Sequence, residues 1–112
     1  MGQVSRKVAA GAAISEAFMI DEDYVVTGFV FDAALTQTAV TFTATADGTN
    51  YVAVEDSTSA AAVGITAEAS KVSMLNTVAT KEGIGPLKNF KAVLGGNNTG
   101  VTWITALTQK VA

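Results

Sequence analysis

The stretch AVTFTATADGTNYVAV, residues 39–54, carries the clearest structural signal in the sequence. Apolar Val40 and Phe42 alternate with threonines, which is the two-residue period of a β-strand with one side turned inward. Asp47-Gly48 follows, and this pair is typical of a turn between antiparallel strands, because glycine adopts positive φ without steric cost. The stretch therefore predicts a hairpin with a strand over Ala39–Thr45 and a return strand over Tyr51–Val54.

Upstream of this hairpin, Tyr24–Phe31 consists of aromatic and β-branched residues and is apolar on both faces. Such a strand lies centrally or is covered on both sides. Gly28 within it indicates a bulge or the close approach of another strand. Ile14–Ile20 predicts a preceding strand, and Asp21-Glu22-Asp23 the turn between the two.

Downstream, Asn89–Leu94 and Val101–Thr108 both alternate in the manner of strands and flank a Gly- and Asn-rich segment. The two runs predict a second hairpin with a six-residue loop. Between the hairpins, Lys71–Leu75 predicts a strand. Thr80–Pro86 contains Gly83, Gly85 and Pro86 and predicts a loop.

These segments predict an all-β fold, an antiparallel, jelly-roll-like β-sandwich of about seven or eight short strands. We expect the sandwich domain to span residues 14–112. Residues 1–13 are rich in glycine and alanine and predict an N-terminal arm.

The composition of the 112-residue chain excludes several kinds of chemistry, because the chain has no Cys and no His. Disulfides, thiolate metal sites, Cys nucleophiles and His-dependent catalytic triads are therefore excluded. The net charge of −3 and the scattered basic residues disfavour nucleic-acid binding. No stretch is apolar enough for a membrane span or a secretory signal, so we expect a soluble product of the cytoplasm.

Three polar segments are candidates for functional sites. Asp21-Glu22-Asp23 is an oxygen-rich candidate for calcium, but the EF-hand pattern fails at its sixth and twelfth positions, so a solvated turn is favoured. Glu55 and Asp56 are adjacent and would point to opposite faces of a strand, which prevents them from flanking one glycosidic bond. Gly95–Asn98 lacks the helix and lysine of a phosphate loop. We therefore expect no enzyme activity, no cofactor and no metal.

The aromatic residues, Trp103 in particular, have two readings. They can line a groove that binds sugar or peptide, but in the strands of a small sandwich they more often form the core. With 15% charged residues and a mean hydropathy of +0.36, the surface is also unusually apolar. Such a surface is commonly covered by a partner, most often by copies of the same chain.

The order of these segments resembles a group of small virion proteins of tailed bacteriophages. The resemblance rests on the strand Ala39–Thr45, the hairpin Asp47-Gly48-Thr49-Asn50-Tyr51, the later strand Leu87–Gly95 and the terminal strand Val101–Leu107. It covers most of the chain from about Val8. The late strand departs from the group's shorter pattern, since it carries Lys88-Asn89-Phe90-Lys91.

The resemblance implies a capsid decoration, or cement, protein on the virion surface, made in the host cytoplasm. Such proteins bind the major capsid protein and often form homotrimers. Their N-terminal arm commonly reaches towards the capsid or the next protomer, which makes Val4, Arg6, Lys7 and Val8 the expected contact residues here. The alternatives are a tail, neck or fibre-attachment component and, from another class, a carbohydrate-binding module.

Overall fold

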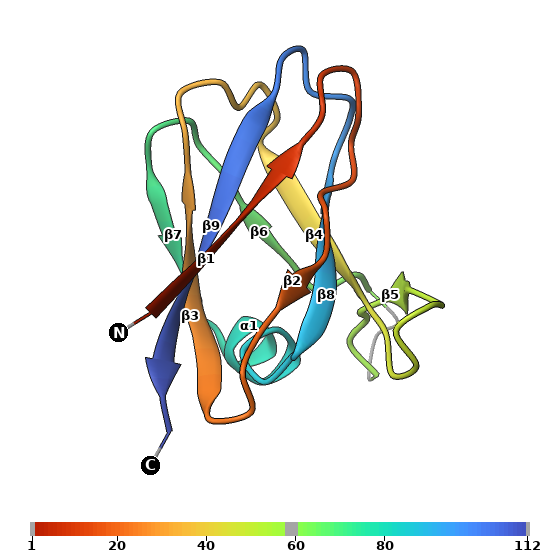
Figure 1. The fold of residues 1–112 in the computed structure, drawn as a ribbon, viewed down its shortest axis with the longest axis vertical. Helices are drawn as coiled ribbons and strands as arrows, with labels where there is room; N and C mark the ends of the chain where they lie inside the picture. The colour runs from red at the N-terminus through yellow and green to blue at the C-terminus, as the bar shows by residue number, and fades with distance from the viewer. Residues whose placement is uncertain (1, 58–60, 112) are drawn as a thin grey trace.

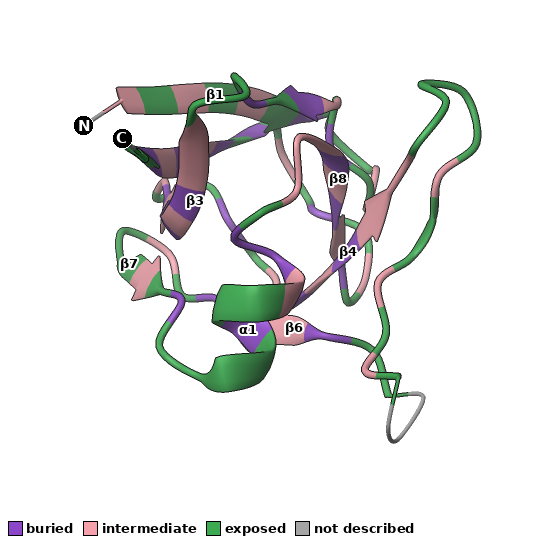
Figure 2. Ribbon diagram, turned by 90° about the horizontal axis from the view of Figure 1, so that it is seen from below, coloured by how far each residue is buried: buried purple, intermediate pink, exposed green. Residues whose placement is uncertain are grey.

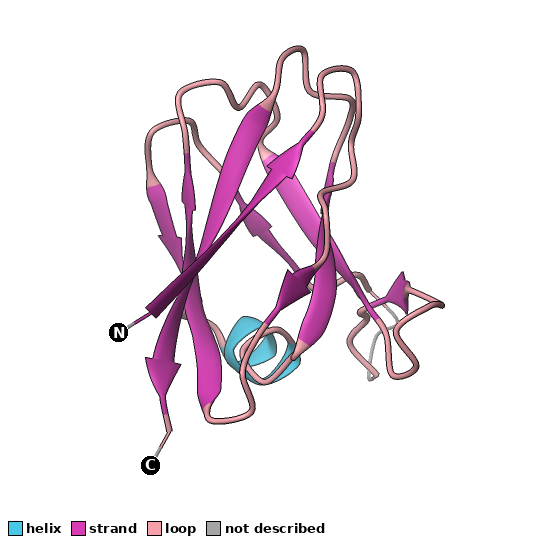
Figure 3. Cartoon of the chain, in the orientation of Figure 1, coloured by secondary structure: helices cyan, strands magenta, loops and turns pink. Residues whose placement is uncertain are grey.

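The computed structural model of the chain describes residues 2–57 and 61–111. Nine strands and one short helix lie within these residues, and the strands form two antiparallel sheets that pack face to face (Figure 1). Figure 3 shows how strands dominate the chain. The predicted all-β antiparallel sandwich is therefore confirmed.

The first sheet has four strands in the order β1-β9-β3-β7. Their bounds are β1 Gly2–Val8, β9 Thr102–Lys110, β3 Tyr24–Phe31 and β7 Val72–Met74. The predicted strand over Lys71–Leu75 corresponds to β7.

The second sheet has five strands, and β4 pairs with three of them, β5, β6 and β8. The bounds are β2 Phe18–Met19, β8 Asn89–Leu94, β4 Ala39–Ala44, β5 Val52–Ala53 and β6 Gly64–Thr66. The strand predicted over Ile14–Ile20 is shorter than expected, since β2 has two residues and Ile14 adds an isolated bridge to Val93.

Phenylalanine rings from both sheets form the centre of the core. Phe90 on β8 stacks on Phe18 with ring centroids 5.0 Å apart, and it meets the edges of Phe29 and Phe42 at 6.1 and 5.9 Å. All four rings are fully or almost fully buried. Figure 2 colours the chain by burial and shows buried residues on strands of both sheets. The sandwich thus rests on aromatic packing contributed by both layers.

The hairpin predicted over residues 39–54 is present, with Thr43 opposite Ala53 and Ala44 opposite Val52. The Asp47 carboxylate holds the turn, because it accepts hydrogen bonds from the backbone N–H groups of Thr49 and Asn50, both at 2.8 Å. These hydrogen bonds lower the pKa of Asp47 well below its usual value. The turn is thus ordered by its own residues.

The bulge predicted at Gly28 is also present, as a shift of register between Val26 and Gly28 where β3 meets β9. A Cβ atom at Gly28 would lie 2.8 Å from the sulfur of Met74 and 2.9 Å from the carbonyl oxygen of Ser73. Glycine is therefore required here by the close approach of β7.

The prediction of a free N-terminal arm over residues 1–13 is wrong for Gly2–Val8. These residues form β1, which pairs with β9 along its whole length, from Gly2 opposite Thr108 to Val8 opposite Thr102. The two-residue period of a strand is present in β1, but it is disguised because Arg6 occupies one of the inward positions. The sandwich domain therefore begins within the segment assigned to the arm, and Met1 lies outside the described residues.

The predicted second hairpin is wrong as well. β8 pairs with β2 and β4, whereas β9 pairs with β1 and β3, so the two strands lie in opposite sheets. Alternation shows which residues of a strand face the core, but it does not identify the neighbouring strand. The Gly95–Gly100 segment is therefore a crossing between layers.

Asn98 holds this crossing in place from a fully buried position. Its side-chain oxygen accepts from the Thr36 N–H at 2.8 Å, and its side-chain nitrogen donates to the carbonyls of Ala34 and Gly100 at 3.1 and 2.7 Å. Its own backbone N–H donates to the Ala12 carbonyl at 2.8 Å. Asn98 thus joins three loops at the same end of the sandwich through its side chain and its backbone N–H.

We expect Asn98→Ala to reduce the free energy of unfolding by about 2–4 kcal/mol, because it leaves the buried partners of the amide unsatisfied. Denaturant unfolding followed by circular dichroism measures the loss. Asn97→Ala is the matched control, since Asn97 is the exposed neighbour. Equal unfolding midpoints for the two variants would contradict this role for Asn98.

The loop predicted over Thr80–Pro86 contains most of the helix α1, Val78–Gly83. A capping box begins the helix, because Thr77 and Thr80 each accept the other's backbone N–H through their side-chain oxygens, both at 3.2 Å. Such boxes usually have Glu or Gln at the second position, so the threonine pair gives a weak signal. Pro86 then prevents the helix from continuing.

Candidate interaction surface

The solvent side of the four-stranded sheet carries a group of apolar side chains on β3, β7 and β9, beside the polar side chains of β1. Phe29 and Phe31 of β3 point into the core, so Gly28 and Val30 face outward. The register places Leu107 and Met74 beside Gly28, and Val72 beside Val30. Trp103 lies on the same side, because it precedes the inward-facing Ile104 of β9. We call this surface the apolar face and define it by Val30, Val72, Met74, Trp103 and Leu107.

Three of these side chains are about half exposed: Val72 at 54%, Met74 at 51% and Trp103 at 47%. The outer side of the five-stranded sheet is more polar along its central strands, although the exposed Ile14 and Met19 lie at its β2 edge. Its central strands present mainly polar residues there: Thr41, Thr43, Asn89 and Lys91, together with Val93. A concentration of exposed apolar side chains on one sheet is typical of a surface that a partner covers.

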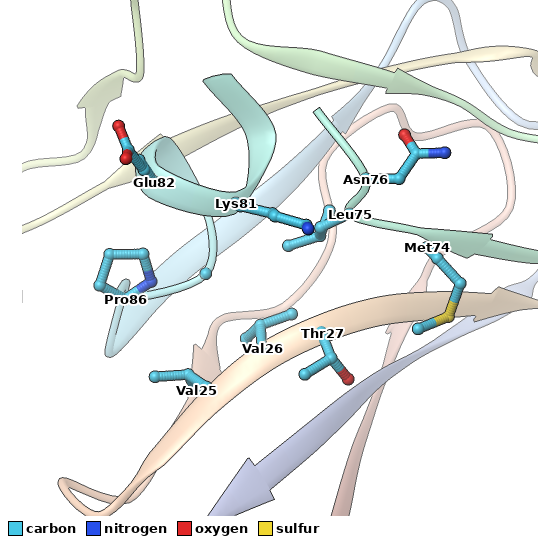
Figure 4. Close-up of a pocket in the computed structure, with 10 residues that line it drawn as sticks. Val25, Val26, Thr27, Met74, Leu75, Asn76, Lys81, Glu82 and Pro86 are labelled. Atoms are coloured by element: carbon cyan, nitrogen blue, oxygen red, sulfur yellow. The ribbon is translucent and has the colours of Figure 1, made fainter. Parts of the chain in front are cut away.

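A groove of about 710 Å³ adjoins the apolar face between β3, β7 and α1. Figure 4 shows its lining, with Val25, Val26 and Thr27 contributed by β3 and Met74 shared with the apolar face. Lys81 and Glu82 of α1 also line it and are exposed. The groove therefore extends the apolar face toward the helical end of the sandwich.

The other end of the apolar face carries charge. Lys7 on β1 lies opposite Trp103 and is exposed. Asp32, which follows β3, accepts the Trp103 N–H at 2.9 Å and the hydroxyl of Thr102. Burial raises the pKa of Asp32, but the hydrogen bonds from Thr102, Trp103 and Ala34 outweigh it and lower that pKa. Asp32 thus stays ionised at neutral pH and fixes the backbone of Trp103.

The contact residues predicted from the arm are placed differently by the structure. Val8 is fully buried and Val4 packs against the core, so neither is available as a free contact residue. Arg6 donates through Nε to the Ala17 carbonyl at 2.7 Å. Lys7 is exposed at the end of the apolar face, and it is the one of the four that adjoins this surface.

The acidic candidate segments form a turn and an isolated bridge. Asp21, Glu22 and Asp23 are exposed in the predicted turn, where the Asp21 carbonyl accepts the Tyr24 N–H at 3.0 Å. Glu55 forms an isolated bridge with Ala62, and Asp56 follows it. Within residues 2–57 and 61–111, no group of three or more Asp or Glu side chains is placed to hold a metal ion.

Sequence reasoning favoured a core position for the aromatic residues, and for Trp103 this is wrong. The five phenylalanines are buried, whereas Trp103 faces solvent. The alternation in Val101–Thr108 contained two apolar sets, one through Trp103 and Leu107 and one through Ile104 and Ala106. Apolar residues at both the odd and the even positions of one strand indicate that one face packs in the core and that the other is suited to contact a partner.

Comparison of the chain with known protein families, curated proteins and solved structures returned no match. None of the helical residues in the described part of the chain forms a segment with the length and hydropathy of a membrane crossing.

Proposed function

We propose that this chain is a non-enzymatic structural protein of a virion, a capsid decoration protein that binds the major capsid protein and stabilises the shell. The observation that carries the proposal is the apolar face, because a half-exposed tryptophan and two half-exposed aliphatic side chains on one sheet favour a protein partner. The resemblance of the strand order to small phage virion proteins supports the same role.

Trp103 is the expected anchor of the capsid contact. Tryptophan is enriched among the residues that contribute most to protein interfaces, and Asp32 and Thr102 already fix its backbone. The affinity of each contact can be modest, because many copies bind one shell. Copies that are joined to one another bind it more tightly than a single copy does. Lys7 at the end of the face adds a charge suited to an acidic neighbour.

Co-sedimentation with shells assembled from the capsid protein of the encoding virus tests the proposal. We expect the wild-type chain to sediment with the shells and Trp103→Ala to bind at least about tenfold more weakly. Val52→Ala is the control, because Val52 is exposed on the other sheet. If the wild-type chain stays in the supernatant, the capsid role is wrong; if both variants bind equally, Trp103 is not the anchor.

A tail, neck or fibre-attachment component is the alternative within the same class. The number of copies in purified virions separates the two, since decoration requires hundreds of copies and a tail part about a dozen or fewer.

A carbohydrate-binding module is the candidate from another class, and the exposed indole of Trp103 is the observation that favours it. Titration of the tryptophan emission with oligosaccharides tests it directly, because the chain has one tryptophan. Saturable changes in emission would favour the carbohydrate module, and an unchanged spectrum favours the structural role.

A further inference from the structure

The two edge strands of the four-stranded sheet both have free backbone groups. On β1, the Lys7 carbonyl accepts from the Glu16 N–H at 3.1 Å, so the backbone of Lys7 points away from β9. Antiparallel strands alternate the direction of these groups residue by residue. Gln3 and Ser5 therefore also point away from β9, and within the described chain no strand pairs with β1 on that side.

The same reasoning applies to β7 at the opposite edge. The Phe31 N–H donates to the Lys71 carbonyl and the Leu75 N–H to the Thr27 carbonyl, both at 3.0 Å. Lys71 and Leu75 thus turn their bonding groups toward β3. By alternation, Val72 and Met74 turn theirs away from the sheet, where the described chain supplies no further strand.

These two edges fit each other in direction and in pleat. Successive strands in the order β1-β9-β3-β7 are all antiparallel, so β1 and β7 run in opposite directions. A second copy turned about an axis along the strands would therefore place its β1 antiparallel to β7. The free residues on both edges also carry their side chains on the outer side of the sheet, as flush pairing requires.

We propose that copies of this chain associate head to tail, with β1 of one copy added to β7 of the next, Gln3 opposite Met74 and Ser5 opposite Val72. A heterologous contact of this kind closes into a ring when the rotation permits and otherwise forms a filament. This inference rests on the proposed structural role and assigns a second copy of the chain as the partner of each edge strand.

The surroundings of the two edges also suit the pairing of one copy with the next. Beside β7, a groove of about 440 Å³ separates its edge from that of β6, and the Ser73 hydroxyl crosses it to the Thr66 carbonyl at 2.9 Å. Beside β1, the exposed Met19 lies next to Gln3. The β1 edge thus presents the apolar side chain of Met19, and the β7 edge presents the groove that the Ser73 hydroxyl bridges. On β1, Arg6 and Glu16 occupy the far half of the edge, which limits pairing to its first half.

Cysteine cross-linking tests the register, and the absence of native Cys makes the result specific. A chain with Gln3→Cys is mixed with a chain of different mass carrying Met74→Cys, and the mixture is oxidised. Directly opposed residues of a hydrogen-bonded antiparallel pair have Cα atoms about 5.5 Å apart, which suits a disulfide. We expect the mixed disulfide to exceed both symmetric products. Gln3→Cys mixed with Val52→Cys is the control.

The mass of the unmodified chain in solution is the second measurement. We expect a multiple of 11.4 kDa by native mass spectrometry. Ser5→Pro removes the N–H donor on the free side and should weaken association at least about tenfold, whereas Ser5→Ala keeps the donor and should not. A monomer at all concentrations, or symmetric Gln3→Cys dimers as the main product, would overturn the inference. A monomer that still binds shells would leave the proposed function standing, and an assembly that does not bind them would leave the head-to-tail contact standing.

Discussion

Phe90→Ala is expected to reduce the free energy of unfolding by about 3–5 kcal/mol, through lost transfer energy and the cavity left among the rings. Phe90 is fully buried and contacts the rings of Phe18, Phe29 and Phe42 from both sheets. Since small domains unfold at a cost of about 5–15 kcal/mol, this change removes a large part of the stability. Denaturant unfolding followed by far-ultraviolet circular dichroism measures it.

Two comparisons define the result for Phe90. Phe90→Leu retains most of the buried volume and should cost less than half as much. Val52→Ala, at a site 67% exposed, should change the unfolding free energy by no more than about 0.5 kcal/mol. A loss below about 1 kcal/mol for Phe90→Ala would show that the aromatic cluster is not the centre of the core.

Deletion of residues 1–8 is expected to destabilise the sandwich by more than about 4 kcal/mol. The deletion removes the whole of β1, exposes one side of β9 and takes away the buried Val8. Burial of one valine contributes about 1.5–3 kcal/mol, and each lost strand hydrogen bond about 0.5–1.5 kcal/mol. Thermal unfolding of the shortened and full chains measures the difference.

A pair of adjacent substitutions separates the role of β1 from a general effect of shortening the chain. Val8→Ser should lower the midpoint of thermal unfolding by several degrees, whereas Lys7→Ser, one residue earlier and exposed, should leave it nearly unchanged. If residues 1–8 served only for attachment, both variants and the shortened chain would unfold at the same midpoint as the full chain.

The strands themselves could be predicted from the sequence wherever a two-residue period coincided with clear turn residues. Val40 and Phe42 followed by Asp47-Gly48 satisfied both conditions, and β4 and β5 are found there. β1 did not, because the inward position of Arg6 broke the apolar pattern and the flanking alanines and glycines suggested flexibility. The guanidinium reaches the Ala17 carbonyl, a contact that depends on the folded chain.

The pairing of strands and the location of the apolar face could not be predicted in this way. Alternation gave the same signal for β8 and β9 whether they paired or faced each other across the core. The exposure of Trp103 depends on which of the two apolar sets of β9 meets the other sheet, and that choice is settled by packing over distant residues. The threonine cap of α1 was missed because Thr77 and Thr80 are also common strand residues.

Asn98, which joins three loops, shares one property with the other buried polar residues: its side chain carries no ionisable group. In the described part of the chain, the buried polar residues are Ser15, Thr80, Asn98, Thr102 and Thr108, and none of these side chains gains or loses a proton in the ordinary range. Asp32, at the margin, has a lowered pKa, so its contribution is complete above the unfolded value and is lost only as the pH falls through the folded one. Among the described residues, the buried interior therefore has no group that changes its protonation near neutrality, and we expect the packing of the sandwich to be insensitive to pH there.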